Sequence, residues 1–79
     1  MTPEAIRDIL IPATLKLAND PIPNIRFNVA KTFIAIIPVL KKANMNNILS
    51  DQIRPTLATL NNDKDLDVKF FASKAISVV

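Results

Sequence analysis

Residues 19–31 read NDPIPNIRFNVAK, and they are the key to the fold, because residues 62–74 repeat their pattern as NDKDLDVKFFASK. Each stretch runs from Asn-Asp through a turn to an aliphatic residue, a cation and Phe, and the offset between them is 43 residues (62 − 19). The same offset pairs further identical residues, namely Pro12 with Pro55, Leu17 with Leu60, and Lys31 with Lys74. An internal repeat of about 40–47 residues, with two helices in each unit, is typical of α-solenoids. An ordinary four-helix bundle is the alternative, but it does not explain identities that recur at one offset.

Turn-forming residues divide the chain into four predicted helices, at about 3–18, 25–42, 50–60 and 68–79. Two prolines within residues 19–24 make that segment a clear helix break. Thr2, Asn24 and Asp67 are the expected N-caps of the first, second and fourth helices. No segment keeps a clean alternation of apolar and polar residues, so we predict no strand.

The fold class that we predict is all-α, an α-solenoid of two HEAT-type helical hairpins with four main helices in a right-handed stack. Repeat one takes residues 1–43 and repeat two takes residues 44–79. On a helical wheel of ~100° per residue, the apolar residues of helix 25–42 cover roughly twice the ~100° stripe that one neighbour needs. This helix is therefore expected to contact both its own partner and the next repeat.

The corresponding surface of repeat two is more polar. Ser73 stands where repeat one has Ala30, and Ser77 stands where it has Ile34. A terminal repeat of a solenoid needs a polar outer face. We therefore expect repeat two to end a stack.

The first helix carries an apolar stripe formed by Ile11, Leu15 and Ala18. Nothing earlier in these residues can cover that stripe, and arrays of this kind usually need three or more repeats for stability. We expect either that the chain is the end of a longer solenoid or that it self-associates through the uncovered first repeat, driven by Ile11 and Leu15.

Composition excludes several kinds of functional site, because the 79 residues contain no Gly, Cys, His, Trp or Tyr. Phosphate-binding loops need glycine, and zinc sites and nucleophilic relays need Cys or His. Asp63, Asp65 and Asp67 are spaced like the start of an EF-hand loop, but Val68 and Lys74 stand where that loop needs Gly and Glu. We therefore expect no enzyme activity, no cofactor and no metal site.

Charge and hydropathy limit the partners. The net charge is +3, and Lys64 lies among aspartates rather than in the basic stripe that nucleic-acid binding favours. The longest apolar run, residues 33–40, is far shorter than the ~20 residues of a membrane span. The first residues also lack the apolar stretch of a signal peptide. We expect a cytoplasmic, and also nuclear, protein without a membrane or nucleic-acid partner.

Two cations occupy matching places inside the apolar arcs, Arg26 in repeat one and Lys69 in repeat two. A cation there needs a partner, since an unpaired buried charge is costly. Asp20 and Asp63 each precede one of these cations by six residues. We predict a structural ladder of aspartate–cation contacts between neighbouring turns.

Residues 20–31 resemble the penultimate repeat of one HEAT family, the scaffolding A (65 kDa regulatory) subunits of type 2A protein phosphatases. Residues 63–72 are similar to the last repeat of that family, and the order and spacing of the two segments match. The resemblance covers about residues 8–79 and is loosest in the first helix of each repeat. It implies a non-catalytic scaffold whose C-terminal repeats dock the phosphatase catalytic subunit through the turns inside each repeat.

Carried over by the resemblance, the contact candidates are Pro21, Ile22, Pro23 and Asn24 in the first turn, and Asp63, Lys64, Asp65 and Leu66 in the second. Turns suit this role because they are exposed and lie side by side along a solenoid. Phe71 is a further candidate, with two alternatives: it is an exposed aromatic anchor, or it folds against the C-terminal residues. The alternative function is a HEAT fragment of another transport or chromatin scaffold that binds an acidic peptide or nucleic acid.

Overall fold

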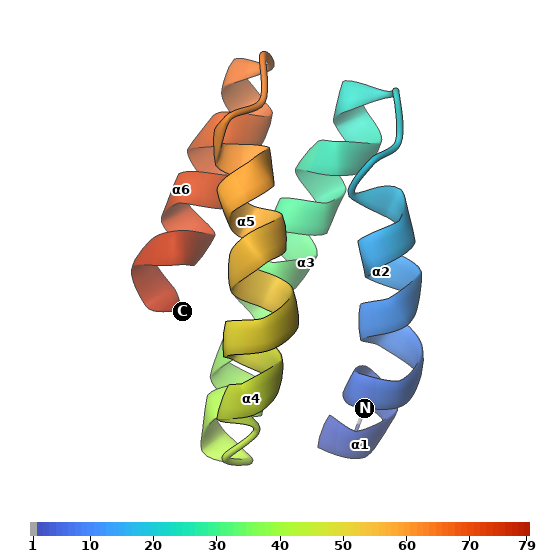
Figure 1. The fold of residues 1–79 in the computed structure, drawn as a ribbon, viewed down its shortest axis with the longest axis vertical. Coiled ribbons are helices and arrows are strands. Elements are labelled where there is room, and N and C mark those ends of the chain that lie inside the picture. Colours follow the sequence, from blue (N-terminus) through green and yellow to red (C-terminus); the bar gives the residue numbers. More distant parts are fainter. Residues whose placement is uncertain (1) are drawn as a thin grey trace.

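The computed structural model describes residues 2–79, and every regular element within them is helical. The elements form four helical rods that follow one another in the chain (Figure 1). They are the continuous run α1 (Pro3–Ala5), η1 (Ile6–Leu10) and α2 (Ile11–Leu17); α3 (Pro23–Lys42); the run α4 (Asn46–Ile48), η2 (Leu49–Ile53) and α5 (Arg54–Asn61); and α6 (Leu66–Val78). The all-α prediction of two helical hairpins is confirmed, while the right-handed sense of the stack stays a prediction.

The start of α3 differs from the prediction. The helix begins at Pro23, and the N-cap is Ile22 in an extended conformation rather than Asn24. Proline is well suited to the first helical position because its fixed φ fits the helix and its missing N–H is not needed there. Pro23 therefore adds two residues to the predicted helix.

The second hairpin also begins its helices early. Its first rod starts at Asn46 rather than near residue 50. The cap of α6 is Asp65, whose carboxylate accepts from the backbone N–H groups of Asp67 and Val68. Asp67, the predicted cap, instead lies in the first turn, where its charge complements the positive end of the helix.

A wide π-helical turn interrupts the first rod of each repeat, and the prediction missed both. In η1 the N–H of Ile11 donates to the carbonyl of Ile6, and in η2 the N–H of Arg54 donates to the carbonyl of Leu49. A proline follows each turn directly, at Pro12 and Pro55. Proline lacks an N–H and its ring collides with the carbonyl four residues earlier, so the preceding turn widens.

The rods form two layers. In one layer α3 packs against α6, which is the most extensive contact between helices, and in the other lie the first rods of the two hairpins (Figure 1). The loop between α2 and α3 and the loop between α5 and α6 lie at the same end of the molecule. This side-by-side packing places the two intra-repeat turns next to each other.

A single apolar core joins the repeats. Phe33, Ile37 and Leu40 of α3 are fully buried in it. Ala30 is also fully buried, whereas Ser73 at the matching place in repeat two is exposed. The difference arises because repeat two covers α3, while nothing within the described residues covers that face of α6.

The prediction that Ile11, Leu15 and Ala18 form an uncovered stripe on the first rod is wrong. Ile11 is fully buried and Ala18 nearly so, and the exposed stripe is instead Ile9, Ala13 and Leu17. The wheel assumed regular helical steps, but the wide turn η1 rotates the residues after it relative to those before it. Ile11 is therefore not available for contact between copies of the chain.

No helix within residues 2–79 is both long and apolar enough to cross a membrane.

Candidate docking ridge between the two turns

The first turn is held in shape by its own aspartate. The Asp20 carboxylate accepts from the backbone N–H of Ile22 at 2.9 Å, an Asx turn that the flanking prolines rigidify. Pro21, Pro23 and Asn24 are exposed, and Ile22 is 53% exposed. An apolar side chain on a rigid, solvent-facing turn can bind a partner at little cost in conformational entropy.

The second turn is built in the same way. The Asp63 carboxylate accepts from the backbone N–H of Asp65 at 2.9 Å, and Asp65 then caps α6. Leu66 is 79% exposed, the highest value among the large apolar residues that stand out on the surface. Lys64 is exposed beside it. Each turn therefore presents one exposed aliphatic side chain.

Arg26 ties the two turns together. Its Nε donates to Oδ2 of Asp63 at 2.6 Å, and its Nη2 donates to Oδ1 at 3.1 Å. Its Nη1 donates to the backbone carbonyl of Asp20 at 2.8 Å. The hydrogen bonds between Arg26 and Asp63 lower the pKa of the carboxyl and raise the pKa of the guanidinium. The side chains of Arg26 and Asp63 are only 18% and 11% exposed, so this bidentate contact crosses the seam between the repeats largely out of water.

The predicted ladder had two cations and two aspartates, but the structure has one ion pair across the seam, between Arg26 and Asp63. Asp20 contributes its carbonyl rather than its carboxylate. Lys69 is exposed, and within residues 2–79 the ion pairs are those of Arg26 with Asp63 and of Arg7 with Asp8. Arg26 reaches forward to the aspartate of the following repeat, and for Lys69 no following repeat is present among the described residues.

A hollow of about 330 Å³ lies between the turns. Its lining residues are Ile22, Pro23, Asn24, Phe27, Asp65 and Asp67. Apolar groups come from the first turn and carboxylates come from the second, so one wall is apolar and the other acidic. We call this hollow, together with residues 21–24 and 63–66, the docking ridge. Such a surface fits a partner that offers an apolar side chain next to a basic one.

Comparison with known proteins shows what the chain is similar to. The sequence pattern of the HEAT repeat matches residues 10–40. The A-type regulatory subunit of protein phosphatase PP2A from Saccharomyces cerevisiae is 42% identical over 76 residues, which is 94% of this chain. The PP2A 65 kDa regulatory subunit of Drosophila melanogaster is 49% identical over 61 residues, 77% of the chain. The beta isoform of the 65 kDa regulatory subunit of phosphatase 2A from Homo sapiens is 45% identical over 58 residues, 73% of the chain.

Within this chain, residues 10–40 carry the HEAT-repeat pattern. The resemblance to the 65 kDa regulatory subunits of type 2A phosphatases is confirmed. The chain spans 12%, 10% and 9% of the yeast, fly and human relatives. All three relatives are named as regulatory subunits of the phosphatase.

The aromatic residues of the two HEAT repeats meet at the seam. The ring of Phe71 packs edge to face against Phe27, with centroids 4.8 Å apart, and against Phe70, with centroids 5.1 Å apart. Phe71 is thus half-buried against repeat one and is not the exposed aromatic anchor that was one of its two alternatives. Phe70 is the exposed aromatic, at 60%, and it was not among the predicted site residues. The sequence did contain a signal for this residue, because Phe70 matches the seam residue Phe27 at the offset of 43 residues. Within residues 2–79 no third repeat covers Phe70 as repeat two covers Phe27.

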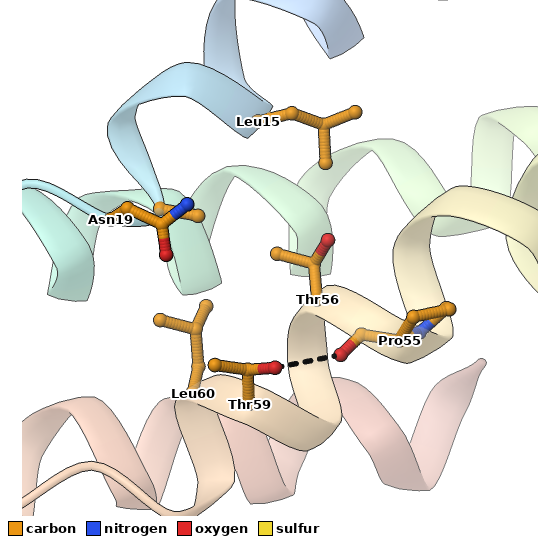
Figure 2. A pocket seen from close by; sticks show the side chains of 7 residues that line it. Leu15, Asn19, Pro55, Thr56, Thr59 and Leu60 are labelled. Atoms are coloured by element: carbon orange, nitrogen blue, oxygen red, sulfur yellow. Dashed lines mark hydrogen bonds between the residues drawn. The ribbon is translucent and has the colours of Figure 1, made fainter.

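A second hollow of about 330 Å³ separates the first rods of the two HEAT repeats (Figure 2). It is lined by Leu15, Ala18, Asn19, Pro55, Thr56, Thr59 and Leu60. Its two threonine hydroxyls donate hydrogen bonds to backbone carbonyls of their own rod. The hydroxyl of Thr59, for example, donates to the carbonyl of Pro55 at 3.2 Å. No charged side chain lines it, so the docking ridge remains the better candidate for specific recognition.

Proposed function

We propose that the docking ridge binds the catalytic subunit of a type 2A serine/threonine phosphatase, as the C-terminal repeats of a scaffolding subunit would. The relatives are named as regulatory subunits of that phosphatase. The observation that carries the proposal is the pairing of Arg26 with Asp63, which holds two rigid turns side by side. Two aliphatic side chains and an acidic hollow are thereby presented on one edge.

The exposed side chains Ile22 and Leu66 are the expected anchors, since apolar groups that become fully desolvated dominate binding energy. Carboxylates of Asp65 and Asp67 would complement a basic side chain of the catalytic subunit. The same carboxylates would repel an anionic ligand. This disfavours the alternative of an acidic peptide or nucleic acid.

We expect this binding to be weak. A stable interface takes about 800 Å² from each partner. The chain exposes 4834 Å² in all, and the ridge is one edge of it. Two repeats therefore supply part of the contact that a long solenoid would make.

The proposed site of action is the cytoplasm and nucleus, which a fluorescent fusion of the chain would test.

The test is a titration of purified phosphatase catalytic subunit onto the immobilised chain. Ile22→Ala and Leu66→Ala should each weaken binding by roughly tenfold. Ile9→Ala is the matched control, because Ile9 is 64% exposed on η1 and lies outside the ridge. Equal binding by all three variants and the parent chain would refute docking through the turns. Binding of the chain to single-stranded DNA that falls steeply with salt would instead support the anionic-ligand alternative.

A further inference from the structure

One surface of repeat one is only partly covered, with Leu17 and Asn28 exposed, although its counterpart in repeat two is buried. A groove of about 200 Å³ lies between α2 and α3, lined by Thr14, Leu17, Ile25, Asn28, Val29 and Thr32. At the offset of 43 residues, these positions become Leu57, Leu60, Val68, Phe71, Ala72 and Ala75. Apart from the half-buried Phe71, these counterparts are at most 1% exposed. The groove is therefore the same surface that repeat two uses to pack against repeat one.

The opposite face of the chain shows the reverse relation. In repeat one, Arg26 and Phe27 reach across the seam to Asp63 and Phe71. Their counterparts in repeat two are Lys69, which is exposed, and Phe70. Repeat two thus presents, to solvent, the two side-chain types that make the seam contacts inside the chain.

We propose that two copies of this chain associate head to tail, with the α6 face of one copy on the α2–α3 groove of the next. In this arrangement Lys69 of one copy pairs with Asp20 of the other, and Phe70 lies over Asn28 at the edge of the groove. The contact repeats the internal seam, with a second copy taking the place of a following repeat. It goes beyond the proposed docking of a phosphatase and does not depend on it.

The Asp20 carboxylate is presented in the same way as the carboxylate that Arg26 already binds. Asp20 accepts from the N–H of Ile22 at 2.9 Å, and Asp63 accepts from the N–H of Asp65 at 2.9 Å. Each side chain is therefore held in the same Asx turn at the start of its loop. The Asp20 carboxylate forms no ion pair among residues 2–79, although Arg26 donates to the backbone carbonyl of the same residue. A lysine arriving from the α6 face of another copy would complement it.

The polar residues of the two surfaces also match. In repeat one, Ala30 of α3 is buried in the apolar core and Ile34 packs against that core. On the proposed contact, Ser73 and Ser77 take those places on one copy, while Asn28 and Thr32 line the groove of the other. Hydroxyl and amide groups can satisfy one another there, so the surface is suited to a second copy rather than to an apolar partner.

This contact is heterologous, since two different faces meet, and it does not close on itself. Association should therefore proceed from dimers to longer chains of copies as concentration rises. We expect it to be weaker than the internal seam, because a lysine replaces the bidentate arginine and serines replace apolar residues.

The test is sedimentation velocity of the full chain from about 10 μM to about 1 mM. The sedimentation coefficient of the parent chain should rise over this range. Lys69→Asp puts two carboxylates in the contact, and Asp20→Lys puts two lysines there, so each variant alone should associate at least about tenfold more weakly. A 1:1 mixture of the two variants should associate again, because each copy then meets the opposite charge.

Controls separate this contact from effects on folding and on total charge. Lys42→Asp and Asp51→Lys make the same charge changes at exposed positions on other parts of the chain and should associate like the parent. If circular dichroism shows that Asp20→Lys is unfolded, Asp20→Asn replaces it among the single variants and the mixture is not made, since asparagine keeps an oxygen for the N–H of Ile22 and removes the charge. A parent chain that stays monomeric throughout, variants that associate like the parent, or a mixture that stays dissociated would each overturn the proposal.

Discussion

The packing of α3 against repeat two can be tested by enlarging one side chain at the seam. Ala30 is 0% exposed, although Ser73 at the same place in the unpartnered repeat faces solvent. Ala30→Leu adds three carbon atoms to a closed site while leaving helix propensity almost unchanged. Overpacking of this kind costs about 1–3 kcal/mol.

That cost is a large share of the stability available. A domain of 79 residues has a free energy of unfolding of roughly 4–12 kcal/mol, at about 0.05–0.15 kcal/mol per residue. With a urea m-value of about 1 kcal/mol/M for so small a domain, the unfolding midpoint should fall by about 1–3 M. The measurement is urea unfolding followed by circular dichroism at equilibrium.

Ala35→Leu is the matched control, because Ala35 is exposed on the same helix and undergoes the same substitution. Its effect should stay within about 0.5 kcal/mol. A closed seam around Ala30 would be ruled out if Ala30→Leu were as harmless as Ala35→Leu. Unfolding of the parent chain in two separate transitions would also rule it out, since a shared core predicts one.

Further predictions concern the contacts across the seam. The hydrogen bond from Arg26 lowers the pKa of Asp63 in the folded chain. The ionised carboxylate therefore stabilises the fold at pH values above its ordinary pKa of about 3.9. This stabilisation is lost as the pH falls through the lowered pKa. Asp63→Asn should therefore flatten the acid side of a plot of stability against pH, whereas Asp51→Asn, at an exposed site, should leave the parent profile; identical profiles for parent and Asp63→Asn would contradict this linkage. Phe71→Ala should lower stability by roughly 1–3 kcal/mol, since it removes two edge-to-face contacts and burial against repeat one, while Phe70→Ala should cost less because Phe70 is 60% exposed. Thermal unfolding compares the two phenylalanine variants, and the reverse order of melting temperatures would count against the seam contact of Phe71.

Much of the candidate site was predictable because it depends on local chemistry. The Asn-Asp turns, their prolines and their spacing of 43 residues are readable along the chain, and repeats of one kind stack side by side. The position of Arg26 within an apolar arc also predicts that it needs a partner. The turns that form the docking ridge therefore follow from sequence, although their use by a phosphatase remains a proposal.

The errors have two causes, which are a local irregularity of the first helix and a contact between residues distant in sequence. Ile11 was placed on the surface because a uniform wheel cannot include the wide turn before Pro12. Phe71 was assigned to solvent or to the C-terminus because its contact, Phe27, comes from the other repeat.

The order of residues is enough to specify a pair of helical hairpins, since helix breaks and apolar periodicity are local properties that recur in both halves. Which cation finds a carboxylate depends instead on the packing of the repeats. Arg26 and Lys69 occupy the same place in the repeat, but Arg26 has a following turn to reach and Lys69 faces solvent. An ion pair needs two groups within a few ångströms, and that distance is set by how the repeats meet and not by either repeat alone.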